Sequence, residues 1–498
     1  MAEPSSSASG SGLNLLVVMA DQQRTDSMPC YGLDFVRTPN IDRLAREGVV
    51  FDRCYTPSPV CVAARAAFMT GQWPSTTGVL GNATHLDFDA VYPLVPSWPR
   101  RIAESGRTTA AIGKMHFYPF DARYGFRERI SCEDKRHVYL RDDFVKFLHL
   151  HGLERVHPTE NPGYVESCGA PVTPLPKRFH CDAYVGDQAA DWLRRRGREP
   201  FAAWVSFPGP HDPYDPPEEM AALYEDAPIP PPIGSADELA TKPRAQRRAG
   251  AEFADNVMFQ LDYSRATPEQ IRRWRAHYYA NITLIDEGVG KILAALEETG
   301  ALDRTVIVYC SDHGDALGDH GIPFKSFFYE SMARVPLIVR GPGVAVGRRC
   351  GALVSLLDVV PLIYRTCGVE PPRTLEGLDL TPLLRDPSGS IRDSVVSEIQ
   401  GRVMVRDDRF KYAHYEDGDA ELYDLVADPT EEHNLVGDRV YQSDVARLRG
   451  LLVEHALRRA ASHAAHNVKP PEPERAALDR AYREGRIGVR RSGRAPTG

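Results

Sequence analysis

Residues 13–22 read LNLLVVMADQ, an apolar run that ends at Asp21 and Gln22. An apolar run without alternating polar residues is typical of a strand that is buried on both faces of a parallel sheet. Similar runs follow in TTAAIG (108–113), FAAWVSF (201–207), TVIVYCS (305–311) and VPLIVRG (335–341). Helical patterns over 38–48 and 278–300 lie between these runs. The alternation predicts an α/β fold with a large mixed or parallel central sheet flanked by helices.

The pattern changes after about residue 385, where short strand-like pieces predict a small antiparallel sheet: SVVSEI (394–399), RVMVRDDRFKYAHY (402–415) and ELYDL (421–425). We therefore divide the chain into a flexible N-terminal tail (1–12), a large α/β domain (13–385), a C-terminal α+β subdomain (386–466) and a basic tail (467–498). The stretch 226–250 is rich in proline, alanine and charge, and is either a lid over a site or a surface insertion.

Composition excludes several classes of protein. The chain has 498 residues, 42% of them hydrophobic, with 60 Lys and Arg against 68 Asp and Glu. It can bury a large core, and its mild acidity argues against nucleic-acid binding. No apolar run approaches the roughly 18 residues of a membrane-spanning helix, and the N-terminus does not resemble a secretory signal. The nine cysteines are scattered and suggest neither a disulfide framework nor a zinc site, so we expect a cytoplasmic protein.

Polar residues that directly follow the apolar runs are candidates for chemistry, because ligands gather beyond the carboxyl ends of parallel strands. Asp21 and Gln22 end the first run, and Asp312 and His313 end another. Two carboxylates, an amide oxygen and an imidazole suit a divalent ion such as Ca²⁺, Mg²⁺ or Mn²⁺. Strand-end capping is the alternative interpretation for either pair.

A second candidate lies in TPSPVCVAARAAFMTGQ (56–72). Cys61 follows two prolines and opens an alanine-rich helical run, and Arg65 lies one turn later on the same face. The free N–H groups of a helix N-terminus favour an anion beside residue 61. The alternative is that Cys61 is a small buried hydrophobic residue.

CVAAR followed by AAFMTGQ resembles the signature of the sulfatase family. The resemblance continues in ADQQRTD (20–26), TPNIDRLAREGVVFDRCY (38–55), GKMHF (113–117), FPGPHDPYDPP (207–217), YCSDHGDALGDHGIPFKSFFYES (309–331) and ELYDLVADPTEEHNLVGD (421–438). It is closest to the choline-sulfatase-like and arylsulfatase-like bacterial members. The resemblance implies an alkaline-phosphatase-like sandwich with its site at one end of the central sheet.

The resemblance also implies the cofactors. In this family a maturase oxidises the cysteine, here Cys61, to formylglycine, whose hydrate attacks sulfur with one hydroxyl and expels sulfate with the other. Asp21, Gln22, Asp312 and His313, together with residue 61, match the ligands of one divalent metal ion. Ca²⁺ is the expected ion and Mn²⁺ the alternative, since imidazole suits Mn²⁺ better.

The remaining roles are implied in the same way. Arg65 would hold the hydrate, Lys114 and Lys325 would neutralise sulfate oxygens, and Asn82 would add a hydrogen bond to the substrate. His116 would act as a general base near the nucleophile, and His211 would protonate or polarise the leaving oxygen. Asp319 and His320 are assigned to shaping their loop.

Two positions depart from the usual family pattern. Ala63 stands where the aerobic maturase prefers proline, whereas radical-type maturases accept alanine. His313 stands where many sulfatases carry asparagine, and this substitution occurs in the choline-sulfatase-like and phosphonate-monoester-hydrolase-like branches. The expected function is hydrolysis of a sulfate monoester of a small molecule or saccharide. The alternatives are a phosphonate monoester or phosphodiester hydrolase, and an unmatured pseudoenzyme that binds sulfated ligands. The basic tail could pack on a neighbouring subunit, so a homo-oligomer is a further expectation.

Overall fold

The apolar run at the start of the chain forms β1 (Asn14–Asp21), which lies near the centre of an eight-stranded sheet in the computed structural model. The structure describes residues 12–91, 95–138, 140–234, 238–249, 251 and 259–466. It divides into two compact units, Met1–Val453 and Glu454–Gly498. Except for residue 12, the two predicted tails (1–12 and 467–498) lie outside the described residues. Among the described helices, none combines the length and the apolar character that crossing a membrane requires.

The strand order of the large sheet is β4-β3-β5-β1-β6-β7-β2-β8. Only β7 runs opposite to the other seven strands, so the sheet is mixed, as predicted. The further strands are β2 (Val49–Tyr55), β3 (Thr108–Gly113), β4 (Glu128–Ser131), β5 (Phe201–Pro210), β6 (Thr305–Ser311), β7 (Arg334–Arg340) and β8 (Arg348–Ser355). All five predicted apolar runs are confirmed as strands.

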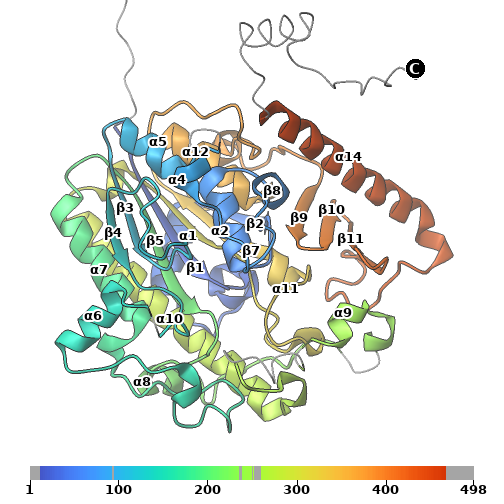
Figure 1. The fold of residues 1–498 in the computed structure, drawn as a ribbon, viewed down its shortest axis with the longest axis horizontal. Helices are drawn as coiled ribbons and strands as arrows, with labels where there is room; N and C mark the ends of the chain where they lie inside the picture. The colour runs from blue at the N-terminus through green and yellow to red at the C-terminus, as the bar shows by residue number, and fades with distance from the viewer. Residues whose placement is uncertain are drawn as a thin grey trace, which may run out of the picture. The chain divides into compact units, whose positions relative to one another are not determined.

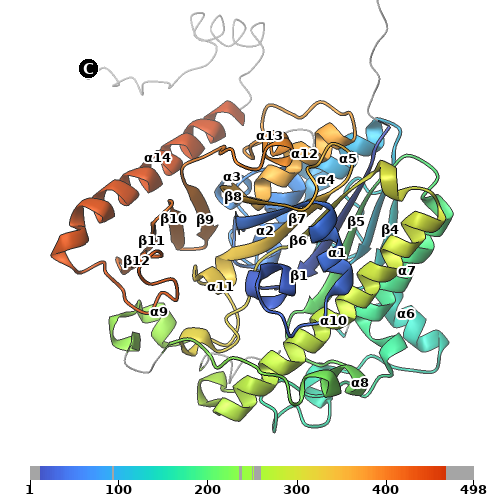
Figure 2. The ribbon, with the colours of Figure 1, turned by 180° about the vertical axis from the view of Figure 1, so that it is seen from behind.

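Helices cover both faces of this sheet, as Figures 1 and 2 show from opposite sides. One face is covered by α1 (Pro39–Glu47), α7 (Cys181–Arg196) and α10 (Pro268–Glu298), and the other by α2 (Cys61–Thr70), α5 (Trp98–Glu104) and α12 (Val359–Thr366). Alternate side chains of β1 enter the two cores, so Leu16 and Val18 pack on the first face and Leu15 and Val17 on the second. The other helices are α3 (Pro74–Thr77), α4 (Phe88–Val91), α6 (Asp143–Leu150), α8 (Glu218–Ala221), α9 (Arg244–Arg247), α11 (Glu330–Ala333), α13 (Thr381–Arg385) and α14 (Gln442–His466).

The long helix α10 begins earlier than the apolar spacing predicted. Thr267 caps it in a capping box with Gln270, and Pro268 occupies the first helical position. Proline is tolerated there because the first N–H groups of a helix have no partner within it.

The C-terminal strands form the predicted antiparallel sheet, in the order β12-β11-β10-β9. Its strands are β9 (Val395–Ile399), β10 (Arg402–Arg406), β11 (Phe410–Tyr415) and β12 (Ala420–Asp424). Residues 238–249 contact this sheet: Lys242 Nζ donates to the Tyr423 hydroxyl at 2.9 Å and Gln246 Nε2 donates to Glu421 Oε2 at 2.9 Å. These contacts favour the surface-insertion interpretation of that stretch. The division at residue 385 stays a prediction.

Candidate active site

Five neighbouring parallel strands, β4, β3, β5, β1 and β6, end at the same edge of the large sheet. The polar residues of the site occupy these ends: Asp134 and Arg136 follow β4, Lys114 follows β3, His211 follows β5, Asp21 ends β1, and Asp312 follows β6. Cys61 is the first residue of α2, in the connection that follows β2. Parallel strand ends therefore bring together residues that lie far apart in the sequence, as the sequence pattern predicted.

Arg65 joins the two carboxylates at the centre of this group. Its Nη2 lies 2.9 Å from Asp21 Oδ2 and its Nε lies 2.8 Å from Asp312 Oδ2. Its Nη1 donates to the Lys114 carbonyl oxygen at 2.6 Å and to Ser206 Oγ at 2.9 Å. Burial alone disfavours the charged guanidinium, but Asp312 and Asp21 raise the pKa of Arg65 above its usual range. The arginine thus stays charged and fixes both carboxylates one helical turn from Cys61.

Four buried residues offer a ligand set for a metal ion. One ligand atom from each of Asp21, Cys61, Asp312 and His313 lies within 4.8 Å of the others. His313 Nδ1 lies 2.9 Å from the Gly314 carbonyl oxygen, so Nδ1 carries the proton and Nε2 presents its lone pair to the group. Two carboxylates and a neutral imidazole fit a divalent cation, whose charge would be partly balanced by these aspartates.

Gln22, the fifth predicted ligand, is already engaged. Its Oε1 accepts a hydrogen bond from Lys325 Nζ at 2.6 Å, and its Nε2 donates to Asp315 Oδ2 at 2.6 Å. The side chain is fully buried beside the four-residue group. Its role as a metal ligand stays a prediction.

Cys61 is surrounded by charged and imidazole groups. Its Sγ lies 3.1 Å from His313 Nε2, 3.1 Å from Lys325 Nζ and 3.6 Å from Asp21 Oδ1. Burial and Asp21 raise the pKa of the Cys61 thiol to about 12. Without a metal ion the unmodified side chain is therefore a neutral thiol near pH 7, whereas a divalent ion bound beside it would favour the thiolate.

The two predicted sulfate-binding lysines have different partners. Lys114 Nζ lies 2.9 Å from Asp21 Oδ2 and 3.0 Å from Asp134 Oδ2, and the side chain is fully buried. Lys325 Nζ lies 2.6 Å from His211 Nε2 as well as near Cys61. His211 Nδ1 donates to the Asp212 carbonyl oxygen at 2.6 Å, so its Nε2 is an acceptor. Both lysines are placed to contact an anion beside residue 61.

His116 and Asn82 lie on the wall of the adjoining cavity. His116 has a φ of 58°, its backbone N–H donates to Glu133 Oε2 at 3.0 Å, and its Nδ1 has no hydrogen-bond partner among the described residues. Asn82 is exposed, and its Oδ1 accepts the Val62 N–H at 3.1 Å. Asn82 thus satisfies a free N–H at the start of α2, a contact that the sequence analysis did not foresee.

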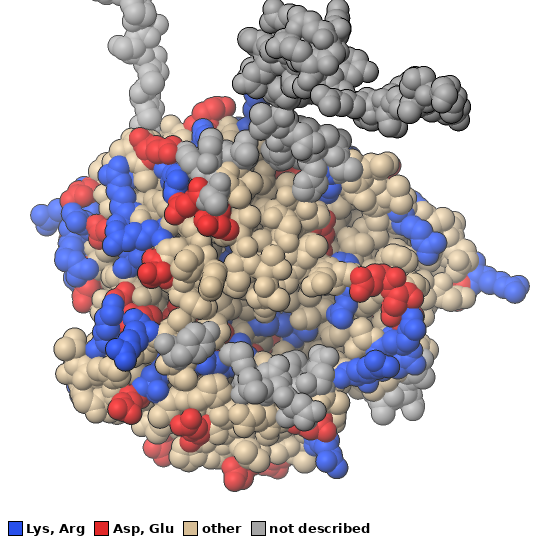
Figure 3. Space-filling view, viewed as in Figure 1, with Lys and Arg blue, Asp and Glu red and all other residues tan. Residues whose placement is uncertain are grey.

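A cavity of about 890 Å³ opens beside this group. Its walls include Asp134, Arg136, Asp212 and Lys325 and the aromatic rings of Tyr118, Phe120, Phe259 and Phe324. Figure 3 shows basic side chains inside a recess near the middle of the molecular face. The cavity has the mixed polar and aromatic lining typical of a small-molecule site.

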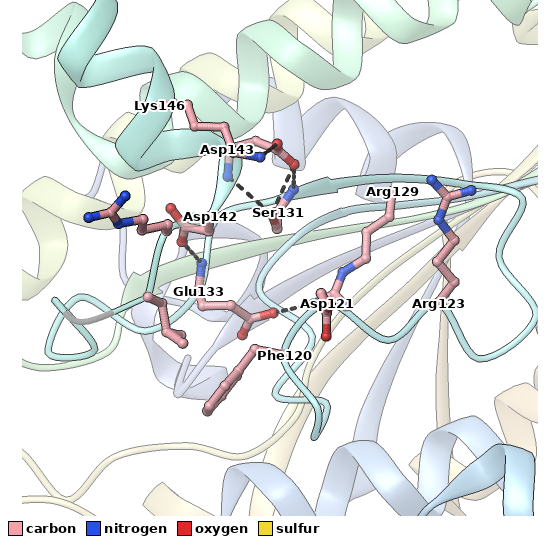
Figure 4. A pocket seen from close by; sticks show the side chains of 11 residues that line it. Phe120, Asp121, Arg123, Arg129, Ser131, Glu133, Asp142, Asp143 and Lys146 are labelled. Carbon is pink, nitrogen blue, oxygen red and sulfur yellow. Dashed lines mark hydrogen bonds and ion pairs between the residues drawn. The ribbon is translucent and has the colours of Figure 1, made fainter.

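Sequence reasoning missed the segment after β4. Glu133 accepts the N–H groups of Met115 at 3.2 Å and His116 at 3.0 Å, and Arg129 Nη2 lies 2.8 Å from Glu133 Oε1. Figure 4 shows Glu133 and Arg129 in a second cavity of about 480 Å³, which shares Phe120 with the first. Glu133 therefore fixes the loop that carries Lys114 and His116. The rule that located the other strand ends did not apply here, because ERIS (128–131) is not an apolar run.

Asp319 and His320 do shape their loop, as predicted. Asp319 Oδ2 lies 2.7 Å from Arg24 Nη1, and Asp319 also pairs with Arg275. His320 Nδ1 lies 2.9 Å from Glu238 Oε1. Their side chains are held by partners outside the ligand group.

Comparison with known proteins gives consistent results. The family model described as Sulfatase matches residues 13–369, and the model of the C-terminal region of N-sulphoglucosamine sulphohydrolase matches residues 318–458. The choline-sulfatase of Rhizobium meliloti (strain 1021) is 34% identical over 442 residues, which cover 85% of this chain and 82% of that protein. The N-acetylglucosamine-6-O-sulfatase of Bacteroides thetaiotaomicron is 25% identical over 506 residues, covering 89% of this chain and 86% of that protein. The structure of phosphonate monoester hydrolase of Agrobacterium radiobacter superposes with a TM-score of 0.77 at 26% identity, covering 91% and 96% of the two chains.

Proposed function

The chain belongs to the sulfatase family and is a sulfuric ester hydrolase, and we propose that it works through a formylglycine made from Cys61 beside one divalent metal ion. One observation carries the proposal. Cys61 Sγ lies 3.1 Å from both His313 Nε2 and Lys325 Nζ at the start of a buried helix. A cysteine sulfur that attacked the ester would form an adduct with no internal route to its release, whereas a geminal hydroxyl at the same position could both attack the ester and later expel sulfate.

The metal would be held by Asp21, Asp312, His313 and residue 61, with Gln22 as the proposed fifth ligand. When bound, a divalent ion supplies a Lewis acid beside the reacting oxygens. We propose Ca²⁺ or Mn²⁺, because the ligand set combines carboxylate oxygens with one imidazole nitrogen.

The chain's own side chains supply the rest of the reaction. Lys114 and Lys325 neutralise the sulfate oxygens, and Arg65 keeps Asp21 and Asp312 in place. His116 is proposed as a base near the nucleophile, and His211 as the group beside the leaving oxygen. Fixed charges of this kind usually contribute the largest share of the barrier reduction.

We propose that the substrate is a sulfate ester of a small molecule or a saccharide. The names of the curated relatives support this class, since one is a choline-sulfatase and another an N-acetylglucosamine-6-O-sulfatase. A maturase that acts on Cys61, a cytoplasmic location and a homo-oligomer stay predictions.

A phosphonate monoester hydrolase activity is the second candidate, since a structure of that activity superposes well and the site carries His313. We expect kcat/KM for 4-nitrophenyl sulfate to exceed that for 4-nitrophenyl phenylphosphonate by about 10- to 100-fold, the worth of one hydrogen bond to a charged group. Gln22, Lys114 and Lys325 place polar atoms around the anion position, where a phosphonate would bring a carbon substituent. Steady-state kinetics on both esters checks this expectation. A higher value for the phosphonate would move the protein to the second candidate.

A further inference from the structure

Arg136 is a fixed cation in the wall of the larger cavity, and the site roles assigned above do not use it. It follows β4, and its side chain is only 11% exposed. Its Nε lies 3.0 Å from Asp134 Oδ1 and its Nη2 lies 3.0 Å from Asp134 Oδ2, which makes a bidentate pair. Its Nη1 lies 3.1 Å from Asp212 Oδ2, and its guanidinium carbon lies 4.7 Å from the centre of the Phe259 ring. A guanidinium held in this way has one orientation.

The position of Arg136 relative to the nucleophile follows from a chain of contacts. Lys325 Nζ lies 3.1 Å from Cys61 Sγ and 2.6 Å from His211 Nε2. Arg136 Nη2 lies 3.3 Å from the same His211 Nε2. The groups therefore follow one another as residue 61, Lys325, His211 and Arg136. In an in-line displacement the leaving oxygen lies opposite the nucleophile. From this order of contacts we infer that His211 and Arg136 line the side on which the leaving oxygen lies.

Arg136 keeps donors for this oxygen even though it is paired. A guanidinium has five N–H groups, and Asp134 and Asp212 engage three of them. The other Nη2 hydrogen faces His211 Nε2, and the second Nη1 hydrogen has no partner among the described residues. Burial alone would lower the pKa of Arg136, but Asp134 and Asp212 raise it above its usual range, so the group stays cationic.

We propose that Arg136 is a catalytic residue that stabilises the negative charge on the leaving oxygen, and that the alcohol released is an alkyl or saccharide alcohol. This inference rests on the proposed sulfatase function. In the transfer step, sulfur bonds to the attacking hydroxyl oxygen, and the bond from sulfur to the leaving oxygen breaks. The electron pair of the broken bond stays on the leaving oxygen, and the proton given up by the attacking hydroxyl finally resides on the released alcohol.

The chemical reason for the substrate class is the basicity of the leaving oxygen. A phenol has a pKa of about 10 and carries the developing charge well without help. An aliphatic alcohol has a pKa closer to that of water, about 15.7, so its oxygen needs a donor as the bond breaks. A fixed guanidinium beside His211 supplies that donor.

The test measures kcat/KM on sulfate esters of increasing leaving-group pKa: 4-nitrophenyl sulfate, phenyl sulfate and a hexose 6-sulfate. We expect Arg136→Gln to lose less than about tenfold on 4-nitrophenyl sulfate and about 10²- to 10³-fold on the hexose sulfate, the scale of one lost preorganised donor. Arg136→Lys keeps the positive charge but cannot form the bidentate pair with Asp134. Its losses of kcat/KM should be smaller than those of Arg136→Gln and again largest on the hexose sulfate.

Arg155→Gln is the matched control. Arg155 contacts the same segment through the carbonyl oxygens of Glu133 and Asp134, but it lines a separate cavity of about 110 Å³. Arg155→Gln should loosen the segment that carries Glu133 and Asp134 and lower kcat/KM for all three esters by a similar factor. A merely structural role of Arg136 would give that same pattern.

Several results would overturn the inference. Arg136→Gln could lower kcat/KM for all three esters by the same factor. It could instead raise only the KM for the hexose sulfate, which would show that Arg136 is a sugar-binding residue. If Arg136→Gln does not fold, Arg136→Lys against wild type gives the same readout. If the wild type releases sulfate from none of the esters, the proposed function itself fails, and the inference fails with it.

Discussion

Replacing Cys61 by alanine should lower kcat/KM for any sulfate ester by on the order of 10⁶-fold, the scale seen when a hydrolase loses its nucleophile. Cys61 is fully buried in a group that includes His313, Lys325 and Asp21, and alanine at this position has no group that can become formylglycine. The charges of the site stay in place, so sulfate binding should persist while turnover stops. Sulfate release and binding of a sulfate ester, measured on the same preparation, separate these two effects.

Cys54→Ala is the matched control for this prediction. Cys54 is also fully buried, but it lies on β2 within the core of the second face of the sheet. It should keep nearly full activity. Comparable activity in Cys61→Ala and wild type would remove residue 61 from the mechanism.

Asp312→Asn should lower kcat/KM by about 10³-fold or more, because it removes a charge from both the proposed metal ligand set and the Arg65 pair. Both oxygens of Asp312 accept hydrogen bonds, Oδ1 from the Gln22 and His313 N–H groups and Oδ2 from Arg65 Nε. Asparagine keeps the shape of the side chain but only one of these acceptors, so the loss combines a missing charge with a missing acceptor. The variant should also need a higher concentration of added Ca²⁺ or Mn²⁺ for half-maximal activity. Chelation followed by metal titration measures this requirement in the wild type and the variant.

Asp319→Asn controls for the removal of a buried charge. Asp319 is fully buried and pairs with two arginines, Arg24 and Arg275, but it lies outside the ligand group. It should lower the thermal unfolding temperature without changing the metal titration. A wild type that keeps full activity after chelation, or identical metal titrations for Asp312→Asn and wild type, would contradict the ligand assignment.

The fold could be predicted largely because its strands are buried on both faces. An apolar run such as 305–311 cannot lie in water, and its abrupt end at Asp312 marks the edge of the sheet. The same rule located both halves of the proposed metal ligand set, Asp21 with Gln22 and Asp312 with His313, without any knowledge of the pairing between strands. β4 escaped this rule because ERIS (128–131) is half-buried at the edge of the sheet and carries polar residues.

The site residues that the sequence analysis missed were missed for the same physical reason. Asp134 and Arg136 follow β4, so a strand that is not apolar hid the residues at its end. Tertiary contacts also give two predicted site residues additional roles. Arg65 fixes two carboxylates, and Asn82 accepts a hydrogen bond from a free N–H group at the start of α2. Such contacts depend on which strand ends become neighbours, and one-dimensional spacing does not contain that information.

The central claim is that Cys61 becomes the formylglycine on which the reaction depends. Trypsin cleaves after Arg53 and Arg65 and releases residues 54–65, a peptide that contains both Cys54 and Cys61. Mass spectrometry with fragmentation of this peptide, from active protein made in its native host, distinguishes the two positions. The account predicts that residue 61 has lost its sulfur and two hydrogens and gained one oxygen, while Cys54 is unchanged. Active protein in which residue 61 of every peptide is an unmodified cysteine would contradict the account.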